Sequence, residues 1–179
     1  KTVAIMPGAA WPGKRFPVHR LIRVMGQLPD CKWLILGKPG EKASEDLFRM
    51  GVAAGCKIYP AFRHLDLVDQ AKVISQSDVL LSNDTGMVHL AEAVGTPVVS
   101  LFGPTRSDLG FGPWRAESKS VETSLWCSPC SKDGSACFRL GKNRYECLSH
   151  IDQTRIVAAL RKVLESPVVT LSEPLRSFS

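Results

Sequence analysis

The sequence predicts an α/β domain of the doubly wound, Rossmann-like type with a mostly parallel sheet. Short apolar runs recur along residues 1–102, and helical spacing of apolar positions follows each run. The chain of 179 residues is 44% hydrophobic, which is enough for one compact domain with a sizeable core. We therefore expect a single domain over residues 1–179.

Five strands alternate with four helices in the manner of repeated βα units. The expected strands cover residues 2–6, 32–36, 57–59, 79–82 and 97–102. The expected helices between them cover residues 17–28, 41–55, 67–76 and 85–94. Because ligands of such sheets collect at the carboxyl ends of the strands, a binding site is expected in the loops after Met6, Leu36, Ser82 and Phe102.

The regular alternation stops after the fifth strand. A stretch rich in Gly, Pro and Ser leads to a sixth expected strand at residues 119–121. Residues 125–149 carry four cysteines and are expected to form an irregular insert. Asp152 has N-cap chemistry for a last helix over residues 153–165, in which apolar residues have helical spacing: Ile156, Val157, Leu160, Val163 and Leu164.

Charge and composition narrow the function classes. The formal charge of +6 suits an anionic partner such as a nucleotide, but Lys and Arg form no basic block, so nucleic-acid binding is not expected. No apolar run approaches the roughly 18 residues that cross a bilayer. Six cysteines without a leader segment indicate a reducing cytoplasm, and the start at Lys1 suggests a piece of a longer protein.

The strongest functional signal follows the fourth expected strand. Residues 82–89, Ser-Asn-Asp-Thr-Gly-Met-Val-His, pass from a strand through a polar turn into a helix. Asp84 or Thr85 can cap this helix, and Gly86 lacks a side chain that would keep a phosphate away from the first N–H groups. His89 lies one turn after Thr85 and projects from the same side. These residues predict a pyrophosphate site; capping alone, with His89 bonded to a neighbouring loop, is the competing interpretation.

The sequence around this motif resembles a known family. Residues 91–105, Ala-Glu-Ala-Val-Gly-Thr-Pro-Val-Val-Ser-Leu-Phe-Gly-Pro-Thr, end the helix at Gly95 and open the next strand at Pro97. The run from Asp84 to Thr105, followed by Gly112-Pro113, resembles the signature of glycosyltransferase family 9. This family includes the ADP-heptose:lipopolysaccharide heptosyltransferases, of which heptosyltransferase II is the most similar.

The resemblance implies the C-terminal, donor-binding half of a GT-B glycosyltransferase, in which two Rossmann-like domains face each other across a cleft. The implied reaction is inverting transfer of heptose from ADP-heptose to the lipopolysaccharide inner core, with no cofactor. In the family the general base lies on the N-terminal acceptor domain, so this chain should hold no catalytic base and should be inactive alone. The lipid-linked acceptor would be reached through that absent domain, at the cytoplasmic face of the inner membrane.

The resemblance also assigns donor-site residues. Lys14, before the pair Phe16-Pro17, matches the lysine that reaches the donor phosphates, where it would join Asp84, Thr85, Gly86 and His89 in stabilising the leaving group. Glu41 matches the acidic residue near the ribose, and a carboxylate can accept hydrogen bonds from the ribose hydroxyls. Leu65 matches the apolar residue that packs on the adenine. Each residue also has a simpler interpretation. Lys14 would be an exposed loop lysine, Glu41 a charge that complements a helix dipole, and Leu65 a core residue.

The cysteine-rich insert supplies four thiols close together in sequence: Cys127, Cys130, Cys137 and Cys147. Four thiolates can hold a structural zinc ion, although the spacing is not that of a common zinc ribbon. Unliganded thiols, an Fe–S site and a disulfide stay open. A similar Cys-x-Pro-Cys insert occurs in members of the family that resemble heptosyltransferase II.

Three other functions remain open at this point. A GT-B glycosyltransferase domain that uses a UDP-sugar would share the architecture and differ at the base pocket. A non-catalytic nucleotide-binding module would bind nucleotide without a partner domain. A metal- or redox-sensing module would depend on the cysteine insert instead.

Overall fold

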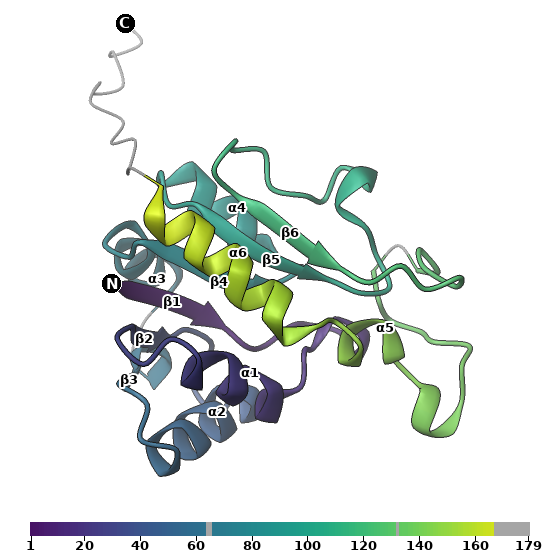
Figure 1. Ribbon diagram of the computed structural model, residues 1–179, viewed down its shortest axis with the longest axis horizontal. Helices are drawn as coiled ribbons and strands as arrows, with labels where there is room; N and C mark the ends of the chain where they lie inside the picture. Colours follow the sequence, from purple (N-terminus) through teal and green to yellow (C-terminus); the bar gives the residue numbers. More distant parts are fainter. Residues whose placement is uncertain (64–65, 132, 167–179) are drawn as a thin grey trace, which may run out of the picture.

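The computed structural model describes residues 1–63, 66–131 and 133–166, and six parallel strands in these ranges form one sheet of order β3-β2-β1-β4-β5-β6. The strands are β1 (Thr2–Met6), β2 (Lys32–Ile35), β3 (Ile58–Pro60), β4 (Val79–Asn83), β5 (Val98–Phe102) and β6 (Lys119–Glu122). The chain builds outward from β1 to one edge, returns to the centre with β4 and builds to the other edge (Figure 1). This order is that of the dinucleotide-binding Rossmann fold, which confirms the predicted fold class.

Helices cover both faces of the sheet (Figure 1). The α-helices are α1 (Val18–Gly26), α2 (Lys42–Ala53), α3 (Leu67–Ser75), α4 (Gly86–Ala93), α5 (Glu146–Ser149) and α6 (Gln153–Glu165). Short 3₁₀ turns are η1 (Pro12–Lys14), η2 (Ala61–Arg63), η3 (Ser107–Leu109) and η4 (Gly141–Asn143). None of the helices in the described ranges combines the length and apolar character needed to span a bilayer.

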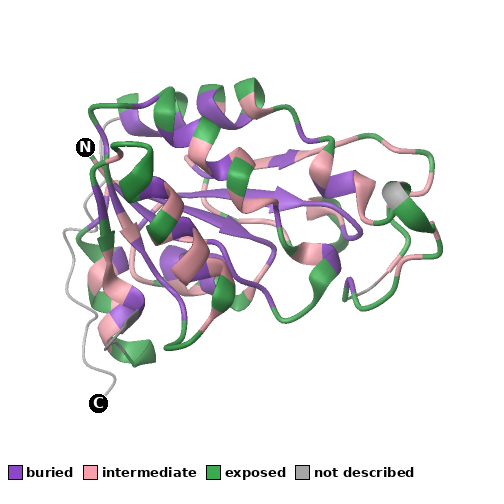
Figure 2. Cartoon of the chain, turned by 90° about the horizontal axis from the view of Figure 1, so that it is seen from below, coloured by how far each residue is buried: buried purple, intermediate pink, exposed green. Residues whose placement is uncertain are grey.

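Alternate residues of β1 point to two separate cores. Val3 and Ile5 pack in a cluster with α1, α2 and α6, whereas Ala4 packs in a second cluster with α3 and α4. All residues of the central strands β4 and β5 are buried, as expected for parallel strands covered on both faces, and Figure 2 shows these strands as the buried centre of the molecule.

Some boundaries differ from those predicted from the sequence. Helix α2 begins at Lys42 rather than at residue 41, because Glu41 keeps an extended backbone with φ −72° and ψ 112°. The insert was expected to be irregular, and it contains the short helix α5 and the turn η4.

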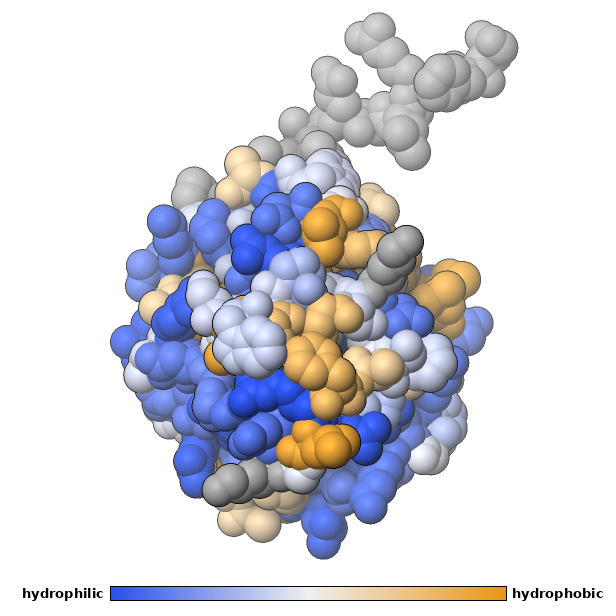
Figure 3. All heavy atoms as spheres, turned by 90° about the vertical axis from the view of Figure 1, so that its right-hand side faces the viewer, coloured by the Kyte–Doolittle hydropathy of each residue, from blue (hydrophilic) through white to orange (hydrophobic). Residues whose placement is uncertain are grey.

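The loops that matter for ligand binding meet at one edge of the sheet. In the parallel register Met6 of β1 is opposite Ser82 of β4, and Asn83 is opposite Leu101 of β5. The chain therefore leaves these three neighbouring strands at nearly the same height. All strands point to the right in Figure 1, and Figure 3 faces that edge, where hydrophilic and hydrophobic residues are interleaved.

Candidate functional site: the N-terminus of helix α4

Helix α4 presents an open N-terminus at the carboxyl edge of the sheet. Thr85 is its N-cap, and its hydroxyl accepts a hydrogen bond from the Met87 N–H at 3.3 Å. Gly86, the first helical residue, is exposed, and a methyl group placed there would meet no other atom within 4 Å. The positive end of the helix dipole and the first N–H groups are thus accessible to an anion.

A cavity of about 600 Å³ lies in front of this N-terminus. It is lined by residues from the loops after β1 and β2 and from α3 and α4: Met6, Ala9, Ala10, Arg15, Lys38, Glu41, Leu67, Thr85, Gly86, Met87 and Leu90. Its size is within the range of small-molecule sites, and it combines apolar walls with a few polar groups. The predicted residues Glu41, Thr85 and Gly86 are therefore brought together by the fold.

Glu41 is held in a narrow gap between two glycines. A Cβ atom added to Gly8 or to Gly37 would overlap the carboxylate of Glu41. The hydroxyl of Ser44 lies 2.9 Å from Glu41 Oε2 and 3.0 Å from the carbonyl oxygen of Leu36. The carboxylate is fixed at the cavity wall, where it can accept hydrogen bonds from ligand hydroxyls.

Lys14 and Asp84 form an ion pair beside the cavity. Lys14 Nζ lies 2.6 Å from Asp84 Oδ2, and the side chains are only 14% and 8% exposed. The Thr105 hydroxyl donates to the same carboxylate oxygen at 2.6 Å. Because an ionised carboxylate only accepts hydrogen bonds, Asp84 is suited to position Lys14 rather than to bind a phosphate itself, and the helix cap is Thr85, not Asp84.

The loop that carries Lys14 is tied to β4 by one buried side chain. Asn83 accepts a hydrogen bond from the Phe16 N–H at 3.1 Å, and its amide donates to the Pro7 carbonyl at 2.8 Å. Two ends of the loop are thereby fastened to the strand that leads into α4. A cation on this loop is held at a defined distance from the helix N-terminus.

The predicted donor residue His89 does not line the cavity. His89 is exposed on α4 one turn beyond Thr85 and is not among the residues that line the cavity, so its contact with phosphates stays a prediction. Leu65 lies outside the described residues. Leu67 and Leu90 supply apolar wall near the predicted position of the base.

Sequence reasoning missed two cationic side chains that line the cavity, Arg15 and Lys38. Arg15 lines it, and its guanidinium donates to the carbonyls of Ala9 at 2.9 Å and Ala10 at 3.3 Å. These bonds hold the guanidinium at the mouth of the cavity, where a second positive charge favours a diphosphate. Its place next to Lys14 in the loop was the available signal.

The four clustered cysteines are free thiols close to one another. Burial first, and then the neighbouring Cys127 and Cys137, raise the pKa of Cys130; burial raises the pKa of Cys147 to about 11. The Tyr145 N–H lies 3.5 Å from Cys137 Sγ. Within the described ranges no three His, Cys, Asp or Glu side chains are arranged to hold a metal ion, so zinc at this cluster stays a prediction.

Comparison with known proteins identifies the family. The family model described as glycosyltransferase family 9 (heptosyltransferase) matches residues 1–138. The chain belongs to glycosyltransferase family 9. The match includes every residue of the cavity and the Lys14–Asp84 pair.

Individual relatives agree with this family. Lipopolysaccharide heptosyltransferase 1 of Pseudomonas aeruginosa is 26% identical over 92% of this chain and 48% of its own length. The solved Escherichia coli ADP-heptose LPS heptosyltransferase II has a TM-score of 0.73 at 20% identity, over 91% of this chain and 46% of that one. E. coli heptosyltransferase WaaC with ADP has a TM-score of 0.65 at 17% identity, over 90% and 44%. This family 9 chain spans about half the length of these relatives.

Proposed function

We propose that this family 9 chain is the ADP-heptose-binding part of an enzyme that transfers heptose to the inner core of lipopolysaccharide. The observation that carries the proposal is the open N-terminus of α4 at a cavity that is also lined by the fixed carboxylate of Glu41. The relatives support the choice of donor, since one is named an ADP-heptose heptosyltransferase and the structure of another contains ADP.

The donor would extend along the cavity. The adenine would lie against Leu67 and Leu90, with Leu65 the further candidate that the family resemblance assigns, and the ribose hydroxyls would donate to Glu41. The diphosphate would accept hydrogen bonds from the first turn of α4, with Arg15 and Lys14 beside it.

In the transfer step an acceptor hydroxyl forms a bond to the anomeric carbon of heptose while the bond to the diphosphate oxygen breaks. The electron pair goes to ADP, and the acceptor proton goes to a general base that we place in the other half of the enzyme. The increased charge on the departing ADP is stabilised by the helix dipole and by the cation of Lys14. No step in this chain needs a metal or another cofactor.

The acceptor and the location are part of the same proposal. We infer a lipid-linked core saccharide bound mainly by the other half of the enzyme, which would work at the cytoplasmic face of the inner membrane. Both rest on the names of the relatives, which act in lipopolysaccharide or lipooligosaccharide synthesis.

A glycine substitution tests the proposal. Calorimetric titrations of ADP, UDP and GDP would compare the unchanged chain with Gly86→Ala and with the control Gly26→Ala. Both glycines are exposed helical residues whose added methyl group meets no atom, but only Gly86 borders the cavity. We expect ADP to bind in preference to UDP and GDP, and Gly86→Ala to weaken ADP about tenfold by crowding a phosphate.

The control should bind ADP as the unchanged chain does, and both variants should keep their melting temperature because alanine is a good helix former. A preference for UDP would favour a different donor. Equal ADP affinities for both variants would place the nucleotide elsewhere.

A further inference from the structure

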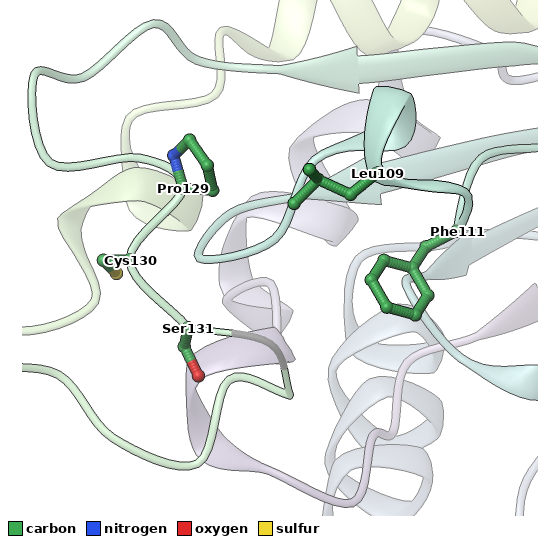
Figure 4. Close-up of a pocket in the computed structure, with 5 residues that line it drawn as sticks. All are labelled: Leu109, Phe111, Pro129, Cys130 and Ser131. Carbon is green, nitrogen blue, oxygen red and sulfur yellow. The ribbon is translucent and has the colours of Figure 1, made fainter.

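A second hollow of about 460 Å³ lies at the same edge of the molecule. One wall comes from the loop between β5 and β6, with Leu109 and Phe111, and the other comes from the cysteine-rich insert, with Pro129, Cys130 and Ser131 (Figure 4). We call this hollow the insert groove. Its walls are mostly apolar, and it is open to solvent on one side.

The insert is fixed to the donor site by backbone contacts. The Cys130 N–H donates to the Pro104 carbonyl at 3.0 Å, next to the Thr105 that holds Asp84. Gly134 of the insert lies directly on Lys14, so that a Cβ atom added to Gly134 would be 2.8 Å from Lys14 Cγ. These contacts fix the position of the insert wall of the groove relative to the ammonium of Lys14.

Lys14 connects the insert groove to the donor cavity. Its ammonium lies 5.8 Å from the centre of the Phe111 ring, which is part of the groove. On the other side, its sequence neighbour Arg15 and Thr85, the neighbour of Asp84, line the donor cavity. A ligand whose phosphates contact Lys14 can thus have one end in the cavity and the other in the groove.

We propose that the insert groove binds the sugar of the nucleotide-sugar donor, with Phe111 and the insert residues 129–131 as its walls. The inference rests on the proposed function. In a nucleotide sugar the diphosphate separates the ribose from the sugar, so in an extended donor whose ribose contacts Glu41 the sugar lies on the far side of the phosphates. The insert groove lies next to Lys14, on the side of its Phe111 contact.

The chemistry of the groove suits a sugar ring. The faces of a pyranose carry C–H groups, which pack on an aromatic ring and on Leu109, whereas its hydroxyls point outward to water and to Ser131 at the open side. The insert then has a role in recognising the donor that does not depend on a metal.

Matched ligands test this assignment. ADP and ADP-heptose would be titrated into the unchanged chain, Phe111→Ala and the control Phe138→Ala, which removes an exposed aromatic ring of the insert that does not line the groove. We expect ADP to bind all three equally, and ADP-heptose to bind Phe111→Ala about fivefold more weakly than the other two.

A covalent label gives an independent readout. Cys130 is exposed in the groove wall, so its alkylation by N-ethylmaleimide can be followed by peptide mass spectrometry. We expect saturating ADP-heptose to slow this alkylation and saturating ADP to leave it unchanged.

Each outcome distinguishes the two proposals. If the chain binds neither ligand, the proposed function fails and this assignment fails with it. If ADP binds but Phe111→Ala and Phe138→Ala bind ADP-heptose equally, and both ligands affect Cys130 alike, only the groove assignment is overturned; the groove would then be left to the acceptor or to the other half of the enzyme.

Discussion

Lys14 and Asp84 carry opposite charges and are largely buried, so the charge of each side chain is stabilised by the other. Removing water from two charges costs several kcal/mol, which their attraction and the hydrogen bond from Thr105 offset. The carboxylate leaves the ammonium with free N–H groups. A nearby diphosphate can accept hydrogen bonds from these N–H groups while Lys14 stays paired with Asp84.

A pair of variants separates the structural and binding roles of these residues. Lys14→Met leaves the carboxylate of Asp84 buried without its cation, and we expect it to lower the free energy of unfolding by about 3 kcal/mol. Adding Asp84→Asn removes the uncompensated charge and should recover more than half of that loss, because an amide oxygen still accepts from Thr105.

Urea denaturation measures both changes, and ADP titration should show weak binding in the double variant despite its recovered stability. Additive losses of stability in the double variant would contradict the coupling of the two residues.

Single residues of the site could be predicted from the sequence, but their contacts could not. The spacing of Thr85 and Gly86 before an apolar helix predicted the open N-terminus correctly. The pairing of Asp84 with Lys14 depends on the path of the loop between residues 7 and 16, and the tie from Asn83 that fixes this path is not visible as a pattern.

Helix α4 is anchored at its carboxyl end as well as at its cap. Glu92 is fully buried, and its carboxylate accepts from the Trp114 and Arg115 N–H groups, each at 2.9 Å, and from the Ser118 hydroxyl at 2.8 Å. The helix is thus joined to the loop that brings Phe111 to the insert groove. Two elements that border the proposed donor site are therefore hydrogen-bonded to each other.

Glu92→Gln tests this connection. Glutamine has an NH2 group in place of one of the two carboxylate oxygens. That group cannot accept a hydrogen bond, so the N–H of Trp114 or of Arg115 loses its acceptor. We expect the free energy of unfolding to fall by about 1–3 kcal/mol, measured by urea denaturation. Glu165→Gln, which changes an exposed glutamate of α6, is the matched control and should have no measurable effect. An equal response of the two variants would refute the role of Glu92.

Elements with regular patterns were predictable, and irregular ones were not. Strand and helix patterns predicted β1 to β6, α1 to α4 and α6 within a few residues, because buried parallel strands and amphipathic helices require those patterns. The hollow between residues 107–111 and 129–131 depends on two loops that meet only in the folded chain.

The molecule as a whole should lose stability in acid. Hydrogen bonds from the Ser135 N–H and neighbouring hydroxyls lower the pKa of Asp133 from 3.8 to about 2, and hydrogen bonds from Thr154 lower the pKa of Asp152. A carboxylate whose pKa is depressed in the folded state contributes stability that is present above about pH 4 and lost as the pH falls toward 2.

We expect the urea concentration at the unfolding midpoint to decrease as the pH is lowered from 4 to 2. The decrease should be less steep in the double variant Asp133→Asn, Asp152→Asn. Asparagine keeps one oxygen, which can accept the backbone N–H of Ser135 or Thr154, and it does not titrate in this range. An identical slope for both proteins would assign the acid loss to other groups.

The outer strands of the sheet affect how the protein behaves at high concentration. Strand β3 has only three residues and ends in Pro60, which has no N–H to offer, and β6 begins and ends with the charged residues Lys119 and Glu122. The free edge of an outer strand is where the sheet of a neighbouring molecule can add by hydrogen bonding. Short length, proline and charge all oppose such joining, so solutions concentrated enough for calorimetry or crystallisation should remain free of sheet-mediated aggregates.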